Sequence, residues 1–126
     1  TSDKTPVLAA LQSLLDVQAT GTRIDLGLQL ALEEQTGPRH TSANTQAIVL
    51  ITDGQHTGLG GSDQVRAVAD QIKAAGISLV TVGLGGDVDA ALLQEIATAP
   101  EYYYPAPNAE DLSRIYSEIA RLIPCP

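Results

Sequence analysis

The sequence contains no Phe, Trp or Met, and only one cysteine among its 126 residues. A single cysteine cannot close an internal disulfide, and Cys125, between two prolines, either pairs outside the chain or is inert. Hydrophobic residues still make up 44% of the chain. They are mainly Ala, Leu, Ile and Val, with four Tyr. An aliphatic core of this kind is typical of parallel strands covered by helices.

Basic residues are also scarce: seven Lys and Arg stand against 15 Asp and Glu, for a formal net charge of -8. Nucleic acid and anionic membrane surfaces would repel such a chain, so we expect neither as a partner. The acids are scattered, which indicates a solvated surface. No apolar run approaches the ~18 residues of a membrane helix. The length allows one domain at most.

Apolar residues at helical spacing predict helices over about 3–15, from Gly21-Thr22 to Gly37-Pro38, from Ser62 to Gly76, through Leu92 and Ile96, and from Asn108 to Leu122. Thr22 and Asp25 have the spacing of a capping box, and Asn108 is placed as an N-cap.

Apolar runs predict strands at Ala47–Thr52 and Ile77–Gly83, each buried on both faces. Tyr102–Tyr104 is a third candidate, interpreted as an edge strand under the last helix. Strands that alternate with helices favour an α/β class, here a three-layer, doubly wound parallel sheet with right-handed crossovers. Ligands bind such sheets at the carboxyl ends of the strands, where Asp53 is expected. Two helices precede the first strand, so we expect a domain truncated at its N-terminus, part of a longer protein.

Two motifs carry a family resemblance: Gly21-Thr22-Arg23-Ile24-Asp25-Leu26-Gly27-Leu28 and Ile48-Val49-Leu50-Ile51-Thr52-Asp53-Gly54. With Val82-Gly83-Leu84-Gly85 and the helices that follow, they resemble the von Willebrand factor A family across residues 1–126, as a C-terminal portion of bacterial, extracytoplasmic type. The resemblance implies a metal-ion-dependent adhesion site above the sheet.

In that family the cation is usually Mg²⁺, with Mn²⁺ or Ca²⁺ as alternatives, and an open position takes a carboxylate from a protein partner. By resemblance, Thr22 supplies a hydroxyl and Asp53 a carboxylate, commonly through water, while Gly21, Gly54 and His56 form the rim. The other ligands come from an Asp-x-Ser-x-Ser motif, which this sequence lacks. We therefore expect an incomplete site here, with weak or absent metal binding, and a complete one in the intact parent.

Simpler explanations exist for the same residues. Thr22 is explained by helix capping and Asp53-Gly54 by a turn. His40 and His56 are expected on the surface, and with Cys125 they form no recognisable zinc set. The glycines at 83, 85 and 86 indicate a strand-to-helix turn rather than a phosphate loop.

The leading hypothesis is a non-enzymatic protein-binding or adhesion module, extracytoplasmic or at the cell surface. One alternative is a metal-free assembly scaffold; another is a cytoplasmic, ATPase-associated member of the family. An Mg-dependent phosphotransferase that uses Asp53 is disfavoured, because no second acid or lysine is evident in the crevice. Without a neighbouring first strand, Ala47–Thr52 would be an apolar edge. We expect instability, aggregation or self-association along it.

Overall fold

The structure is a computed structural model that describes residues 5, 9, 21–41 and 43–123. The helix predicted over 3–15 lies outside the described residues apart from Thr5 and Ala9, and so does Cys125.

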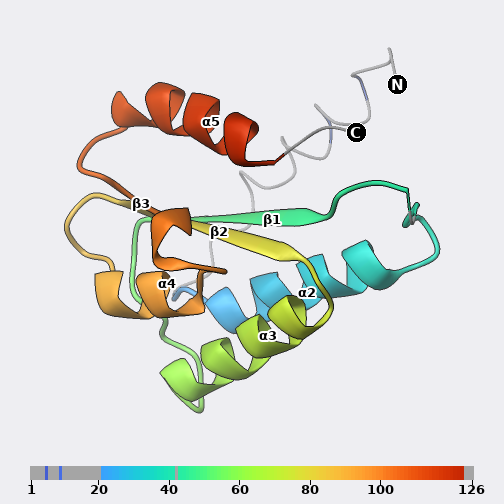
Figure 1. Ribbon diagram of the computed structural model, residues 1–126. Helices are drawn as coiled ribbons and strands as arrows, with labels where there is room; N and C mark the ends of the chain where they lie inside the picture. Colours follow the sequence, from blue (N-terminus) through green and yellow to red (C-terminus); the bar gives the residue numbers. More distant parts are fainter. Residues whose placement is uncertain (1–4, 6–8, 10–20, 42, 124–126) are drawn as a thin grey trace.

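Helices and strands alternate along the described chain, as predicted (Figure 1). The helices are α2 (Ile24–Thr36), α3 (Ser62–Ala74), α4 (Ala90–Ile96), α5 (Asp111–Leu122) and the short 3-10 helix η1 (Pro100–Tyr102). The strands are β1 (Ala47–Thr52), β2 (Ser78–Leu84) and β3 (Tyr103–Ala106). No helix in this part of the chain combines the length and apolarity needed to cross a bilayer.

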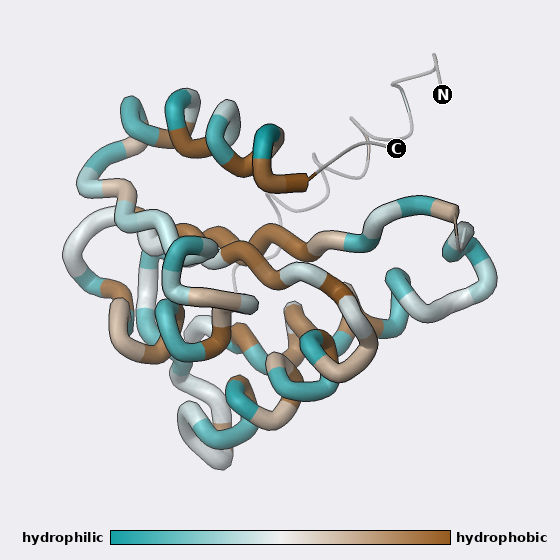
Figure 2. Tube along the Cα trace, viewed as in Figure 1, coloured by the Kyte–Doolittle hydropathy of each residue, from teal (hydrophilic) through white to brown (hydrophobic). Residues whose placement is uncertain are grey.

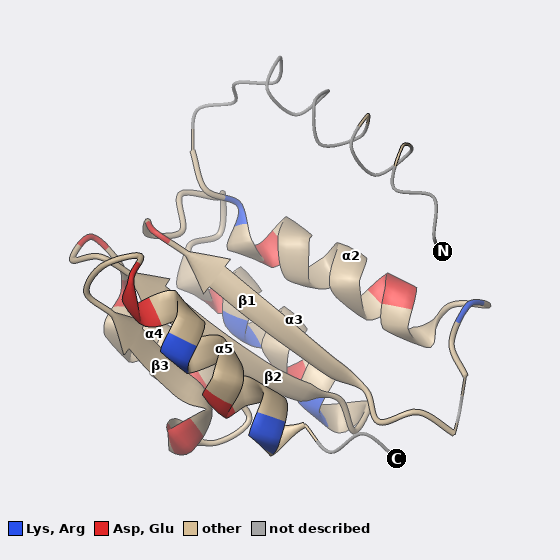
Figure 3. Ribbon diagram, turned by 90° about the horizontal axis from the view of Figure 1, so that it is seen from above, with Lys and Arg blue, Asp and Glu red and all other residues tan. Residues whose placement is uncertain are grey.

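The three strands form one sheet in the order β1-β2-β3, and both pairs are parallel. The predicted parallel α/β architecture is therefore confirmed. The strands carry no charged residue, and the charges lie on helices and loops (Figure 3). The carboxyl ends of β1 and β2 meet at one edge of the sheet, because Thr52 lies across from Gly83.

Helices cover the two faces of the sheet unequally. α2, α3 and α4 pack on one face in a cluster that includes Leu28, Ile72 and Leu79. α5 packs on the other face, where Ile115 and Ile119 contact Val80 and Val82 (Figure 1). The hydropathy colouring follows this arrangement, with apolar residues along the strands and the inner side of α5 (Figure 2).

β1 is not buried on both faces, so that prediction was wrong. Ile48 is 8% exposed, but Val49 and Ile51 are each 40% exposed. Val49 is the register partner of Val80 on β2. Val80 is fully buried, in a cluster with Ile115 and Ile119 of α5. α5 thus covers β2 and β3 but leaves the same face of β1 open. Among the described residues β1 pairs with β2 alone and forms an edge.

Two caps were predicted, one at the C-terminus of α3 and one at the N-terminus of α5. α3 ends as expected at Gly76, whose φ is +77°. The Gly76 N–H donates to Lys73 and the Ile77 N–H to Ile72, the pattern of a Schellman motif. For α5 the N-cap prediction was wrong: Glu110 holds that position, and the Asn108 side chain accepts from the Glu110 N–H instead. Asn108 forms the turn before the helix because its short side chain reaches a backbone two residues on.

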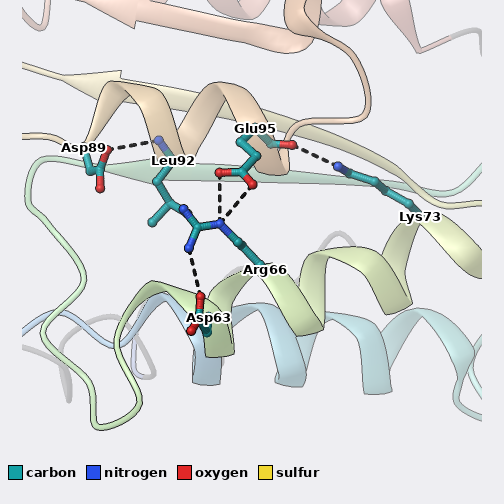
Figure 4. Close-up of polar contacts among 6 residues, drawn as sticks. All are labelled: Asp63, Arg66, Lys73, Asp89, Leu92 and Glu95. Atoms are coloured by element: carbon teal, nitrogen blue, oxygen red, sulfur yellow. Dashed lines mark hydrogen bonds and ion pairs between the residues drawn. The ribbon is translucent and has the colours of Figure 1, made fainter.

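α4 has only seven residues and is tied to α3 by two polar contacts (Figure 4). Arg66 of α3 donates from Nε to both Glu95 carboxylate oxygens at 2.9 Å and from Nη1 to Asp63. Lys73 donates to the Glu95 carbonyl. A helix this short is marginal in isolation, so these contacts and the burial of Leu92 and Leu93 hold it in place.

Candidate functional site at the carboxyl edge of the sheet

The loop that follows β1 folds back onto the start of α2. The Thr22 N–H donates to Thr57 Oγ1 at 2.8 Å, and the Thr57 N–H donates to the Thr22 carbonyl at 2.9 Å. Gly21 allows this approach, because its φ is +104° and a Cβ there would lie 2.7 Å from Thr57 Oγ1. This Thr22–Thr57 contact joins two segments 35 residues apart.

The Thr22 hydroxyl lies beside Gly54, the residue after Asp53. A Cβ at Gly54 would be 3.3 Å from Thr22 Oγ1. The predicted capping box is wrong: Arg23 holds the N-cap position of α2, and no side chain caps the helix. The capping box does not form, because the Asp25 carboxylate accepts hydrogen bonds from Arg23 instead. No hydrogen bond from the Thr22 hydroxyl is found within the described ranges, so capping does not account for this side chain.

Asp53 is exposed at the end of β1 and has no hydrogen bond or ion pair in the described part of the chain. The turn beside it is held by Thr52 instead. The Thr52 hydroxyl donates to the Gly54 carbonyl at 2.9 Å and accepts from the Gly54 N–H at 3.3 Å. The turn explanation thus accounts for Thr52 and Gly54 but not for the Asp53 carboxylate. The Thr22 hydroxyl thus lies beside Gly54, which follows Asp53 in the sequence.

His56 is not a surface residue, contrary to prediction: its side chain is 1% exposed. Its Nδ1 lies 3.7 Å from Asp25 Oδ1, and neither ring nitrogen has a hydrogen-bond partner among the described residues. Gly58 makes room for the ring, since a Cβ at position 58 would lie 2.6 Å from the His56 Cε1 and Nε2 atoms. His40, by contrast, is exposed as expected and contacts Gln46.

An ion pair that was not predicted from the sequence lies beneath the loop. Arg23 donates from Nε and Nη2 to the two oxygens of Asp25, at 2.9 and 2.8 Å. The Asp25 side chain is only 9% exposed. The hydrogen bonds from Arg23 lower the pKa of Asp25 to about 2, helped by the Leu26 N–H and by the positive charge nearby. The signal that could have indicated this burial was an aspartate next to Ile24 and Leu28 on the inner helical face.

Thr22 and Asp53 offer the oxygen ligands that a hard divalent cation prefers. They suit such an ion in kind but not in number, because Mg²⁺ takes six ligands in octahedral geometry. No cluster of three or more His, Cys, Asp or Glu side chains able to hold a metal occurs among the residues that the structure describes. Water or further protein oxygens would have to supply the remaining positions.

The described residues thus form a parallel α/β domain, and at the carboxyl edge of its sheet the Thr22 hydroxyl and the Asp53 carboxylate have no hydrogen-bond partner among them. The chain belongs to the von Willebrand factor type A domain family, whose sequence profile matches residues 1–118. Mouse matrilin-1 is 35% identical over 98 residues, which cover 72% of this chain and 18% of matrilin-1. The chain therefore spans less than a fifth of that relative's length.

Two solved structures share the fold. Proximal thread matrix protein 1 from the mussel byssus, described with a zinc-occupied MIDAS motif, superposes with a TM-score of 0.68 at 24% identity, over 90% of this chain and 28% of that one. The manganese-loaded TRAP protein of Plasmodium vivax gives 0.64 at 19% identity, over 90% of this chain and 46% of that one. At these identities the likeness concerns the fold alone.

Proposed function

We propose that the chain is part of a non-enzymatic protein-binding or adhesion module whose site is the carboxyl edge of β1. Thr22 and Asp53 act there as oxygen ligands of a divalent cation, and Gly21, Gly54 and His56 shape the rim. The observation that carries the proposal is the Thr22 hydroxyl, which lies beside Gly54 and is not used to cap α2. Zinc and manganese are named for two proteins that share the fold, which favours a divalent cation as the ligand to test here.

The cation proposed for the intact protein is Mg²⁺, with Mn²⁺ or Ca²⁺ as alternatives, and its partner is a protein that presents a carboxylate. A carboxylate oxygen would complete the coordination sphere, as a hard ion requires. Two protein oxygens bind Mg²⁺ poorly, so binding by this chain alone is weak, and an Asp-x-Ser-x-Ser motif elsewhere in the parent would strengthen it. The setting proposed is extracytoplasmic or cell-surface, of bacterial type; a cytoplasmic setting is the alternative.

The site is tested with Mn²⁺, whose unpaired electrons broaden NMR signals of nearby nuclei. Millimolar Mn²⁺ is expected to broaden the backbone amide signals of Thr22 and Gly54 in the wild type. D53A should abolish the broadening, while D70A, which removes an exposed aspartate on α3, should leave it unchanged. Equal broadening in wild type and D53A would refute Asp53 as a ligand.

A metal-free assembly scaffold is the second candidate, favoured by the small number of oxygen ligands among the described residues. A scaffold differs from a metal-dependent module in that it still binds its partner protein when a chelator removes the cation. If the intact protein binds its partner equally well with Mg²⁺ and with EDTA, the scaffold function holds and the metal-dependent one fails.

We also propose that copies of the chain associate along β1. The strand has six residues without a charge, Val49 and Ile51 are 40% exposed, and one edge is unpaired within the described residues. Such edges pair with other strands unless charges or bulges prevent it. V49K should reduce the self-association seen by sedimentation velocity, whereas L30K, on the exposed side of α2, should not. A wild-type chain that stays monomeric at all concentrations would contradict this.

A further inference from the structure

The helix α2 carries apolar side chains on two opposite sides. Ile24 and Leu28 are buried in the core, whereas Leu26 is 50% exposed and Leu30 is 67% exposed. At about 100° of rotation per residue, positions 26 and 30 fall on the side of the helix away from the two buried residues. A helix that is apolar on all sides is usually covered on all sides. This outer face of α2 has no cover among the described residues.

The outer face of α2 is open and ends in a negative charge. Gly27 lies beside the two exposed leucines, and a Cβ there would meet nothing within 4 Å. Figure 3 shows no described helix or strand beyond α2 on the side away from α3. Near the end of the helix the exposed Glu33 accepts a hydrogen bond from Gln29 and has no ion pair in the described ranges. A matching partner would present apolar side chains and, at one end, a positive charge.

The N-terminal segment of this chain, residues 3–15, has a sequence that fits the outer face. Its apolar spacing predicts a helix as long as α2, which has 13 residues. Thr5 and Ala9, the two described residues of the segment, are helical and exposed. They are four positions apart and therefore lie on one side of a helix. Val7, Leu11 and Leu14 fall on the opposite side, where an apolar seam requires a partner.

The connection between this segment and α2 suits an antiparallel pair. Residues 16–23 join the two helices, and a connection of about eight residues is within the usual range for neighbouring antiparallel helices. Pairing through the exposed leucines removes their side chains from water, which stabilises the contact.

Charge favours the same arrangement. In an antiparallel pair the beginning of the segment lies at the end of α2, so Lys4 comes near Glu33 and Leu11 comes between Leu26 and Leu30. The open face of β1 is also apolar, but the strand carries no charged residue and offers no partner to a lysine.

We propose that residues 3–15 fold back as an antiparallel helix onto the outer face of α2, with Leu11 between Leu26 and Leu30 and Lys4 beside Glu33. The contact is intramolecular and does not depend on a cation or on the function proposed above. Its consequence concerns Thr22, which lies in the connection between the two helices and is also bound to Thr57. The hairpin would hold the Thr22 segment from a second side.

Alkylation of a cysteine at position 30 tests the cover. C125S removes the one natural cysteine, and L30C then reports access to the outer face through its rate of reaction with iodoacetamide. Adding L11S should raise that rate roughly tenfold, because the segment no longer stays docked. A9S is the matched control and should leave the rate unchanged, since Ala9 is exposed. Equal rates in L30C with and without L11S would overturn the proposal.

Two further measurements guard against other causes of a changed rate. D70C, at an exposed position of α3, should react equally fast with and without L11S if the fold is intact. The rate at L30C should also be independent of protein concentration, as an intramolecular contact requires. A rate that rises on dilution would assign the outer face to a second copy of the chain and overturn the proposal.

A charge reversal tests the direction of the pair. K4E should raise the L30C alkylation rate about twofold, within the small range expected of an exposed ion pair. Adding E33K to K4E restores opposite charges and should return the rate to its original value. No recovery in the double variant would show that Lys4 does not lie beside Glu33, and the antiparallel arrangement would fail.

Discussion

β1 and β2 are adjacent parallel strands with similar apolar sequences, yet their surroundings differ. β2 is covered by helices on both faces, and Leu79, Val80, Thr81 and Val82 are fully buried. β1 is covered on one face, and its open edge ends in the loop with the candidate site. Two apolar strands therefore differ in role: β2 holds the core together, and β1 is partly open to contact. The position in the sheet, not the composition, decides between these roles.

The largest difference is expected between V80A and V49A, which delete the same atoms at register partners. Val80 is fully buried, so V80A should lower the free energy of unfolding by roughly 2–3 kcal/mol. V49A should cost about 1 kcal/mol or less, because Val49 is already 40% exposed. Urea denaturation followed by circular dichroism measures both. Equal losses would show that the open face of β1 is covered in solution.

Asp53 after β1 and Asp89 after β2 give a smaller contrast. Asp89 caps α4 by accepting from the Leu92 N–H at 3.0 Å, so D89A should destabilise the protein by about 1 kcal/mol. D53A should change stability by less than about 0.5 kcal/mol, since Asp53 is exposed without a partner in the described residues. The same urea experiment compares them. A costly D53A would mean that the carboxylate is structural rather than available to a ligand.

The last contrast concerns acid and the ion pair at the start of α2. Because the folded-state pKa of Asp25 is lowered from 3.8 to about 2, its ionised form stabilises the fold above the ordinary value. That contribution is lost as the pH falls from about 4 towards 2. The stability difference between wild type and D25N should therefore shrink over this window in urea melts at successive pH values.

Much of the fold could be predicted from periodicity. The spacing of Val65, Val68, Ala69 and Ile72 placed α3, and each of them is buried. The apolar runs gave β1 and β2, because they are short and rich in the β-branched residues Val, Ile and Thr, which favours a strand over a buried helix. Burial on the second face of β1 could not be predicted, because it depends on which helix covers which strand. A local pattern contains no such information.

The site was predictable only in part. The two proposed oxygen ligands, Thr22 and Asp53, came from a motif resemblance, and the structure brings Thr22 beside Gly54. His56 was misjudged because a glycine-rich loop suggests exposure, while Gly58 here allows the ring to pack inward. The Arg23–Asp25 pair joins residues only two apart, but spacing alone does not reveal whether the Asp25 carboxylate caps the helix or pairs with Arg23.

The Thr22–Thr57 contact has a mechanical consequence. Tension on a ligand held at this edge would enter the molecule at two points at once, through α2 and through β1. Along β1 it would act parallel to the strand, where six register pairs with β2 share the load in shear. Pairs loaded together resist rupture better than pairs opened one at a time, so this end of the sheet is suited to bearing a pull.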